Sequence, residues 1–476
     1  MSHDVAVIGG GVSGLAVAWE LMRHGHRVTV LERQVGVGGN AISERFGGFL
    51  MEHGPSSVVA VSGRETELSE ALQINHQRCE LGAQVRYRYL HIGAGLHRIA
   101  THPLGFVLSD CLSPLARLRL LAEPLVRSRK ADRDETVAEF VTRRFGAQFA
   151  NRVMDALVGG LYAGTAETVS MEAVFPALVA MEQRYGSIMR GVLKRRREGG
   201  RMPGRRLFSW TEGIGQLPRA LARDLGAAVK TGVTVRRIRR TSDGYRIEAG
   251  KDGELRVPAV VLATQPHVAA QLFEGVDESA ADAAGGIVAP PLSVVFLGFR
   301  RDQVEHPLDG LGYLAPSSQG SRLTGALFCS SMFPGRAPDG HVALAGYLGG
   351  ARAPELACLA ERDLIAAARA EFADLLGARG EPVVARVRHW SRGLPQYRTG
   401  HRQRVETLLA APQREAGLFV TGNYFQGPGI AACLAQAKET SARVHRYLDD
   451  RAGWMAGGLH EMSKSKESIL GDAQVT

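Results

Sequence analysis

The fold of this chain is decided near its start, by DVAVIGGGVSGLAVAWELMRHGHRVTVLER at Asp4–Arg33. The apolar run Val5–Ile8 is typical of a strand buried in a parallel sheet. Three glycines with the spacing G-x-G-x-x-G follow it, and apolar residues at helical spacing then continue to His24, before Gly25. A second apolar run, Val28–Leu31, completes the pattern. This order predicts a βαβ unit with a glycine-rich turn after its first strand.

Each glycine of this turn has its own physical role. Gly9 allows the tight turn, Gly11 lets the backbone approach a pyrophosphate, and Gly14 lets the helix pack closely on the strand. The first N–H groups of the helix can bind phosphate at the positive end of the helix dipole. Glu32 follows where a carboxylate accepts hydrogen bonds from ribose hydroxyls and repels a 2′-phosphate. The sequence therefore predicts a dinucleotide site, and NADP is not the first choice.

The residues after Glu32 favour FAD over NAD. A second glycine cluster, RQVGVGGN, occupies Arg33–Asn40, and GGFLMEHGPSS follows at Gly47–Ser57. Simple NAD dehydrogenases continue with another helix at this point. The arrangement resembles the flavoprotein oxidase superfamily that includes amine oxidases and phytoene desaturases. This resemblance implies that Gly38 and Gly39 lie against the pyrophosphate and ribityl chain of FAD.

Three later segments are expected to complete the flavin site. Thr231–Ile238 is predicted to be a strand before a hairpin turn, and Val257–Pro266 contains an apolar strand. Leu418–Arg443 fits a strand, a glycine loop and a helix, whose dipole would stabilise negative charge on the reduced flavin. The predicted FAD-binding residues are Gly9, Gly10, Gly11, Ser13, Gly14, Glu32, Arg33, Gly38, Gly39, Asn40, Gly54, Pro55, Ser56, Val235, Ala263, Thr264, Gly422, Asn423, Gly429 and Ile430.

These segments are far apart in the sequence, so we predict an α/β fold with a discontinuous Rossmann-like FAD-binding domain. Strand-rich runs between them predict a mixed-sheet substrate domain, and an Ala/Leu/Arg-rich stretch predicts an inserted α-helical domain. The expected boundaries are residues 1–80, 208–275 and 404–450 for the FAD-binding domain, 81–97 and 276–403 for the substrate domain, 98–207 for the helical domain, and 451–476 for a disordered tail.

A more specific resemblance starts with DETVAEFVTRRFGAQFANRVMDALVGGLYAGTAETVSMEAVFPALVAMEQRYGSI at Asp134–Ile188. This stretch is similar to the protoporphyrinogen oxidase family, as are HWSRGLPQYRTGH at His389–His401 and RYLHIGAGLHRI at Arg88–Ile99. The resemblance implies oxidation of protoporphyrinogen IX to protoporphyrin IX, a six-electron reaction in three flavin cycles. Oxygen is then the acceptor, hydrogen peroxide is formed, and the helical domain binds a membrane surface.

The same resemblance implies four substrate-binding residues. Arg88 would hold a propionate as a bidentate donor. Tyr347 and Leu314 would line the slot for the ring, and Gly164 falls in a loop whose backbone carbonyl would face the macrocycle. No catalytic acid or base is assigned. The candidates for a general base are His53, His389 and His401, and the structural interpretation of each is preferred.

Other functions stay open at this point. Coproporphyrinogen III has four propionates instead of two, and additional cations for them could come from Arg86, Arg98 and Arg392. A flavin amine oxidase or a carotenoid desaturase would share the flavin fold without explaining the similarity of Asp134–Ile188. A non-catalytic flavin protein would bind FAD without turnover.

The charge distribution favours an anionic surface as a partner. The net charge is +10, and basic residues cluster in Arg117–Arg133 and Lys194–Arg206. No nucleic-acid-binding motif accompanies them, and no apolar stretch reaches the length of a membrane span. No targeting segment is recognised at the N-terminus, so we expect a cytoplasmic protein held peripherally on the cell membrane, and a homodimer is an open alternative. The five scattered cysteines show no metal-ligand spacing, so no metal is predicted.

Overall fold

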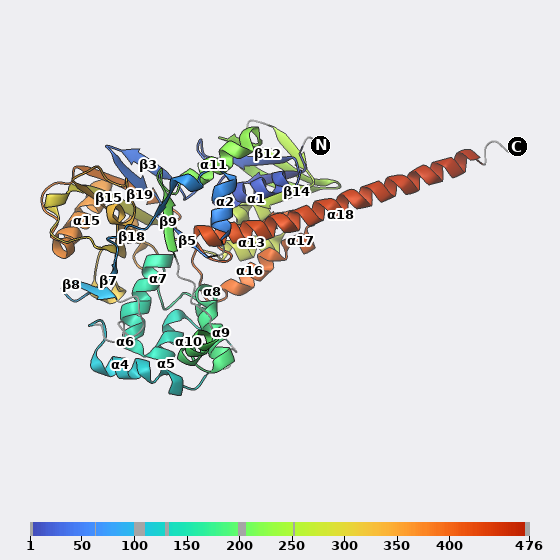
Figure 1. Ribbon diagram of the computed structural model, residues 1–476. Helices are drawn as coiled ribbons and strands as arrows, with labels where there is room; N and C mark the ends of the chain where they lie inside the picture. The colour runs from blue at the N-terminus through green and yellow to red at the C-terminus, as the bar shows by residue number, and fades with distance from the viewer. Residues whose placement is uncertain are drawn as a thin grey trace.

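The computed structural model describes residues 3–61, 63–99, 110–128, 133–198, 206–250 and 253–471, with side chains described up to residue 452. Figure 1 shows a large body that holds the sheets, a lobe of helices below it, and one long helix that extends to the side. Parts of both predicted basic clusters, 129–132 and 199–205, lie outside the described residues, as do residues 472–476 of the predicted tail.

The N-terminal pattern forms the predicted βαβ unit in a five-stranded parallel sheet. Its helix α1 spans Val12–Arg23, and Gly25 follows it with φ +85°. In spatial order the strands are β10 (Val229–Thr231), β2 (Val28–Glu32), β1 (Val5–Ile8), β14 (Ala259–Leu262) and β20 (Leu418–Val420). The side chains of β1 are all buried, as expected for a parallel strand with both faces covered.

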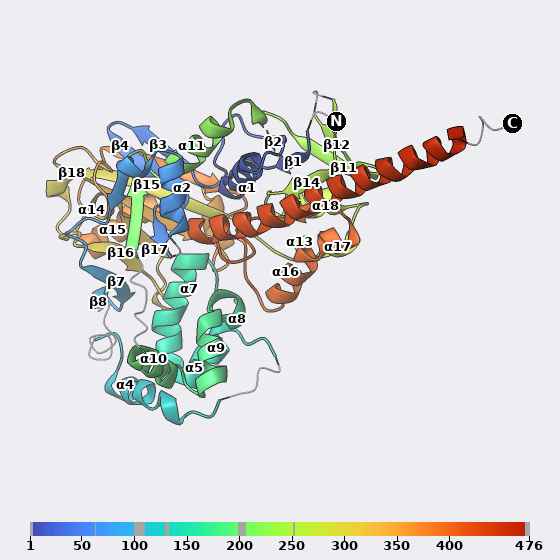
Figure 2. The same cartoon turned by 45° about the vertical axis from the view of Figure 1, so that its right-hand side comes forward.

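Helices cover both faces of this sheet. On one face, α1 packs with α11 (Gln216–Leu225) and with the first part of α18 (Ile430–Gly471), which lies beside it in Figures 1 and 2. On the other face lie α12 (Pro266–Phe273), α13 (Glu278–Gly285), α16 (His401–Leu409) and α17 (Ala411–Arg414). The predicted boundary after residue 275 therefore separates α13 from the sheet that its alanines pack against.

Two segments near this domain differ from the sequence predictions. A single strand over Thr231–Ile238 is wrong, because Gly232 turns the chain with φ +74° and separates β10 from β11 (Val235–Thr241). Strand β11 pairs in a separate antiparallel sheet with β12 (Gly244–Ala249) and β13 (Glu254–Val257). The expected disorder from residue 451 also differs, since α18 continues to Gly471 through residues that include the good helix formers Glu, Lys and Met.

A second sheet of seven strands forms the other half of the body. Its order is β19 (Val384–Trp390), β15 (Leu292–Arg300), β18 (His341–Gly349), β17 (Gly325–Phe328), β16 (Gly310–Leu314), β7 (Tyr87–Ile92) and β8 (Gly95–Ile99). Only β16 and β7 are parallel neighbours. Helix α15 (Glu361–Leu376) covers one face, and β8 extends past the predicted boundary at residue 97.

Short elements connect the two large sheets. They are β3 (Ser43–Phe46), β4 (Phe49–Glu52), β5 (Val58–Ala60), α2 (Arg64–Ala71), β6 (Arg78–Glu80), β9 (Arg206–Trp210) and α14 (Cys329–Met332). Strand β9 lies between β5 and β6, so the chain returns from the helical lobe directly to the side of the body that holds the parallel sheet.

The lobe inserted between β8 and β9 is helical. It contains α4 (Pro114–Leu121), α5 (Val137–Phe145), α6 (Ala147–Phe149), α7 (Asp155–Tyr162), α8 (Met171–Val174), α9 (Pro176–Tyr185) and α10 (Ile188–Arg197). Its core is formed by apolar residues such as Phe140, Val158 and Met181. Within the part of the chain that the structure describes, no helix has the length and apolar character needed to cross a membrane.

Candidate active site

The glycine turn after β1 has no room for side chains. Gly9 has φ +113°, and a Cβ there would lie 2.5 Å from the carbonyl oxygen of Ala263. A Cβ on Gly14 would overlap the carbonyl oxygen of Gly9. Gly11 is the N-cap of α1, and no side chain caps this helix end. The first N–H groups of α1 are therefore available to an anionic ligand.

Glu32 is held against this turn. Its Oε2 accepts a hydrogen bond from the N–H of Gly10 at 2.6 Å, and its Oε1 accepts one from the N–H of Gln34 at 2.7 Å. A Cβ on Gly10 would lie 2.9 Å from the Cβ of Glu32. The carboxylate therefore sits at the end of β2 beside the glycine turn, as the sequence predicted for a group that contacts ribose.

The second glycine cluster lies directly on the first. The N–H of Gly38 donates to the carbonyl oxygen of Gly10 at 2.8 Å, and Gly38 also pairs with Gly11 in an isolated parallel bridge. A Cβ on Gly39 would lie 3.2 Å from the Cα of Gly11. Glycines about 27 residues apart in sequence thus form one surface without side chains.

The C-terminal segment reaches the same place. Gly429 precedes α18, and a Cβ built there would meet no atom within 4 Å, so this helix begins at open space. The side chain of Ser13 in α1 hydrogen-bonds Cys433 in α18, and burial raises the pKa of that thiol to about 11. The N-terminal turns of the two helices are therefore joined, and their free N–H groups lie in the same region.

Two predicted substrate residues lie in register with each other across three strands of the seven-stranded sheet. Leu314 on β16 pairs with Gly325 on β17, and Gly325 pairs with Tyr347 on β18. Paired residues of neighbouring strands point to the same face, so Leu314 and Tyr347 flank Gly325 on one face of the sheet. A Cβ on Gly325 would lie 3.3 Å from Leu314 Cδ2, so the leucine side chain covers the glycine. Burial raises the pKa of the Tyr347 hydroxyl far above its usual value, which keeps the group neutral.

Gly164 lies in a turn where two of the recognised sequence blocks, Asp134–Ile188 and His389–His401, meet the segment that follows the Tyr347 strand. The carbonyl oxygen of the preceding residue, Ala163, accepts from the N–H of Ala351 at 2.7 Å. The amide of Gln396 donates to the carbonyl oxygen of Tyr162 at 2.9 Å. A Cβ on Gly164 would lie 2.8 Å from Gln396 Oε1, a buried acceptor without a hydrogen-bond partner among the described residues.

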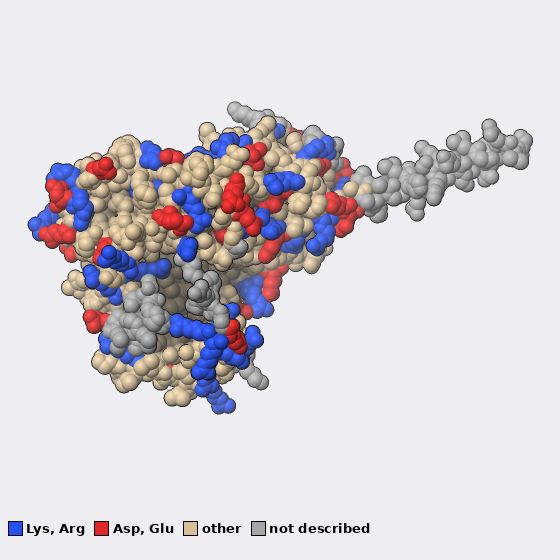
Figure 3. Space-filling model, viewed as in Figure 1, with Lys and Arg blue, Asp and Glu red and all other residues tan. Residues whose placement is uncertain are grey.

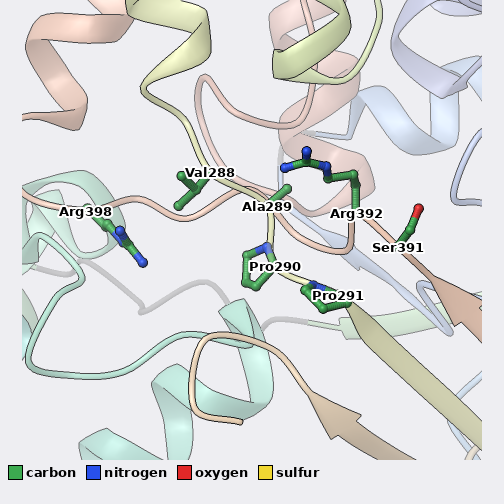
Figure 4. Close-up of a pocket in the computed structure, with 7 residues that line it drawn as sticks. All are labelled: Val288, Ala289, Pro290, Pro291, Ser391, Arg392 and Arg398. Atoms are coloured by element: carbon green, nitrogen blue, oxygen red, sulfur yellow. The ribbon is translucent and has the colours of Figure 1, made fainter. Parts of the chain in front are cut away.

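An open cavity of about 480 Å³ lies beside this junction (Figure 4). The apolar wall of the cavity is connected to the end of the strand that contains Tyr347. The carbonyl oxygen of Pro291, in this wall, accepts a hydrogen bond from the N–H of Gly350, directly after that strand, at 2.8 Å. Two exposed arginines lie at its edges. The lining residues are Val288, Ala289, Pro290, Pro291, Ser391, Arg392 and Arg398. In Figure 3 the surface is hollowed between the body and the helical lobe.

Most of this lining was missed from the sequence. Of the seven residues, only Arg392 was considered, as an additional cation. The available signal was the position of Arg398 directly after the GLPQY block, but nothing in the sequence indicates that Val288–Pro291 pairs with that block. The N–H of Gln396 donates to the carbonyl oxygen of Val288 at 2.9 Å, and that of Gly393 to Pro290 at 2.9 Å.

Arg88 lies outside the residues that line the cavity. It is exposed on β7, two residues before Leu90, whose register partner is Leu314. Since alternate residues of a strand share a face, Arg88 lies on the same side of the sheet as Leu314. The structure therefore places Arg88, Leu314 and Tyr347 on one sheet face and Gly164 in the turn near its end.

The profile of the family described as flavin containing amine oxidoreductase matches residues 12–445, nearly the whole chain. The chain belongs to this family. A chloroplastic protoporphyrinogen oxidase of Oryza sativa subsp. japonica is 30% identical, over 94% of this chain and 89% of the relative. A coproporphyrinogen III oxidase of Bacillus subtilis (strain 168) is 25% identical, over 93% of this chain and 98% of the relative. A crystal structure from Exiguobacterium sp. 255-15, whose protein is provisionally described as a protoporphyrinogen oxidase, matches with a TM-score of 0.81, 23% identity and coverage of 94% and 99%.

As a member of this family, the chain is an oxidoreductase whose cofactor is FAD. The geometry fits this cofactor, because the glycine surface, the carboxylate of Glu32, the uncapped N-terminus of α1 and the N-terminus of α18 lie together. We call this region the FAD tract. Gly54 lies so close to Asn40 that a Cβ on it would overlap the carbonyl oxygen of Asn40. The GPSS segment therefore packs on the second glycine cluster. At the other end, the hydroxyl of Tyr397 donates to the carbonyl oxygen of Asn423.

The three histidines of this flavin oxidoreductase that the sequence singled out all have structural partners. His53 Nε2 lies 2.9 Å from Glu44 Oε2, and burial lowers the pKa of His53. His389 Nδ1 lies 3.1 Å from the carbonyl oxygen of Ala357. His401 Nε2 donates to the carbonyl oxygen of Tyr424 at 2.8 Å. These contacts hold each histidine in place. None of the three is among the residues that line the cavity, so none is placed there as a base.

Proposed function

We propose that this flavin oxidoreductase oxidises protoporphyrinogen IX to protoporphyrin IX. The observation that carries the proposal is the meeting of the Tyr162–Gly164 turn, the Tyr347–Gly350 segment and the Leu394–Tyr397 segment beside an apolar cavity with arginines at its edge. A large apolar ring with carboxylate arms requires this combination of surfaces. The curated relatives named protoporphyrinogen oxidase support the same substrate.

The residues of the chain would bind and orient the substrate. FAD, when bound, supplies the acceptor for the electrons that leave the macrocycle. Tyr347 and Leu314 would flank the ring, and Arg88 would hold a propionate by charge-assisted hydrogen bonds. Six electrons leave in three two-electron cycles, and three oxygen molecules take them up to form three molecules of hydrogen peroxide. No acid or base is assigned among the described residues.

Oxidation of coproporphyrinogen III is the second candidate. The observation that favours it is the pair of exposed arginines at the cavity, Arg392 and Arg398, in addition to Arg88. Among the residues that the structure describes, neither arginine has an ion-pair partner. Both can therefore bind substrate carboxylates. Four propionates would use such cations more fully than two. The relatives named coproporphyrinogen III oxidase support this alternative.

Direct turnover tests both candidates. FAD-loaded protein is mixed with anaerobically prepared protoporphyrinogen IX or coproporphyrinogen III, oxygen is admitted, and porphyrin fluorescence is followed against a control without enzyme. We expect acceleration with protoporphyrinogen IX and a higher kcat/KM for it than for coproporphyrinogen III. The reverse preference would establish the second candidate, and no acceleration with either substrate would reject both.

Arg88 gives a sharper test of the binding mode. We expect Arg88→Ala to raise KM about 10- to 100-fold, because a hydrogen bond to a charged group contributes about 1.5–3 kcal/mol. Flavin content should not change, since Arg88 lies on the substrate sheet. The matched control is Arg256→Ala, which removes another exposed strand arginine from the sheet of β11–β13. Equal KM values for the two variants would remove Arg88 from the site.

We also propose that the helical lobe attaches the protein to a membrane surface. Leu115, Leu118 and Leu125 have exposed fractions of 77%, 64% and 84% on or just after α4. Basic residues fill the last turn of α10, from Lys194 to Arg197, and Figure 3 shows Lys and Arg at the lower end of the lobe. Exposed leucines beside basic residues suit an anionic bilayer. A cytoplasmic location and a homodimer are part of the same proposal.

A further inference from the structure

Two histidines from opposite ends of the chain meet at the surface of the flavin domain. His26 follows α1, His445 lies in α18, and His26 Nε2 is 2.9 Å from His445 Nδ1. The ring of His24 stacks on that of His445, with centroids 4.4 Å apart. Asp449 lies one turn further along α18, with Oδ2 3.4 Å from His445 Nε2. We call these four residues the histidine cluster.

The cluster has the donors of a transition-metal site. One ligand atom from each of His26, His445 and Asp449 lies within 4.8 Å of the other two. Two nitrogens bound to one tetrahedral Zn²⁺ at 2.0–2.1 Å are about 3.3 Å apart, close to the observed separation. Metal-bound histidines usually donate their other N–H to a carboxylate, and Asp449 is placed to accept from His445 Nε2. Imidazole nitrogen suits Zn²⁺ and its neighbours among the divalent transition metals.

We propose that His26 Nε2 and His445 Nδ1 bind a divalent transition-metal ion of the Zn²⁺ class. Asp449 orients His445 from the opposite side of the ring, and His24 covers its face. Both metal-binding histidines are half-buried, so solvent reaches the site and can supply the remaining ligands.

The position of this site gives it a structural role. Helices α1 and α18 pack side by side, and their N-terminal turns are joined at the FAD tract by Ser13 and Cys433. A metal ion between His26 and His445 joins the same two helices about 20 Å further along, given 1.5 Å per residue. It therefore stabilises the FAD-binding domain and takes no part in turnover.

Zinc binding to FAD-loaded, tag-free and chelator-treated protein tests the proposal. Isothermal titration should show one Zn²⁺ per chain in the wild type. His26→Ala and His445→Ala should each weaken binding at least tenfold, and Asp449→Asn should weaken it about 10- to 100-fold, as is typical for loss of an orienting carboxylate. The matched control is His76→Ala, which removes an exposed histidine outside the cluster and should leave Zn²⁺ affinity unchanged.

Thermal unfolding provides a second readout that does not depend on porphyrinogen turnover. Zn²⁺ should raise the Tm of the wild type and of His76→Ala, and should leave the Tm of His26→Ala and His445→Ala unchanged. Flavin absorbance of each metal-free variant shows that it is folded. Wild-type protein without stoichiometric Zn²⁺ binding, or cluster variants that bind as tightly as His76→Ala, would overturn the proposal.

Discussion

His401 is a single residue whose titration should be visible in the stability of the whole protein. It is buried, it donates to the carbonyl oxygen of Tyr424, and burial lowers its pKa from 6.5 to about 4. The neutral form is therefore favoured in the folded state. The associated stabilisation is complete above pH 6.5 and is lost as the pH falls towards 4. A shift of this size corresponds to ~3 kcal/mol.

The variant His401→Gln isolates this effect. The glutamine amide can still donate to Tyr424, but it does not titrate, so its stability should fall less steeply between pH 6.5 and pH 4. Urea unfolding at a series of pH values, followed by flavin fluorescence, measures the difference. Parallel pH profiles for wild type and variant would show that another group controls the acid sensitivity.

Individual residues also show what a sequence can and cannot reveal. Gly9 and Gly14 could be identified because their constraint is local and produces a fixed spacing. His26 and His445 could not, since they are 419 residues apart and no short spacing joins them. Gln396 was quoted within a recognised block, but its buried and unpartnered Oε1 depends on packing against Tyr162–Gly164.

Among the elements, a buried ion pair holds the helices of the lobe together and should contribute strongly to its stability. Arg144 on α5 is fully buried, pairs with Glu123 and lies 3.3 Å from Glu182 Oε1 on α9. Glu123 also accepts from the N–H of Ile188 at the start of α10, at 3.0 Å. The Arg144 guanidinium and the carboxylates of Glu123 and Glu182 therefore connect three helices and the turn after α4.

We expect Arg144→Met to destabilise the lobe by about 3–5 kcal/mol, because it leaves a buried carboxylate without its cation. The control Arg133→Met removes an exposed arginine that pairs with Glu139 and should cost less than about 1 kcal/mol. Limited proteolysis of the lobe and thermal unfolding measure the effect, and FAD content should be retained because the pair is remote from the flavin tract. Equal protease resistance of the two variants would contradict this prediction.

The elements themselves were predictable where one local signal dominates. Strands β1 and β2 with α1 match the apolar runs and the glycine stops within a residue or two. The break between β10 and β11 was missed because both sides have strand composition and only three residues, of which Gly232 is the single turn signal, separate them. Helix α13 was assigned to the wrong side of a boundary because its alanines show no preference until α12 and α16 surround them.

For the molecule as a whole, the arrangement of the two parts bears on membrane attachment. The helical lobe projects below the body in Figures 1 and 2, and its lower end carries α4 and α10. The exposed leucines of α4 therefore lie at an extremity, where they can enter a bilayer without moving the sheets. The turn after α7 that contains Gly164 belongs to the same lobe, so the lobe that we propose to attach is continuous with the proposed substrate site.

Replacing Leu115, Leu118 and Leu125 together by serine should reduce binding to vesicles that contain phosphatidylglycerol at least tenfold. Full burial of each leucine contributes about 1.5–3 kcal/mol, so partial insertion of three is enough for this change. The matched control replaces exposed apolar residues of the body, Val35, Leu359 and Val383, by serine. Co-sedimentation measures binding, and added salt should weaken it further because Lys194–Arg197 contribute through screened charge. If the body variant loses as much binding as the lobe variant, the protein attaches through another surface or not at all.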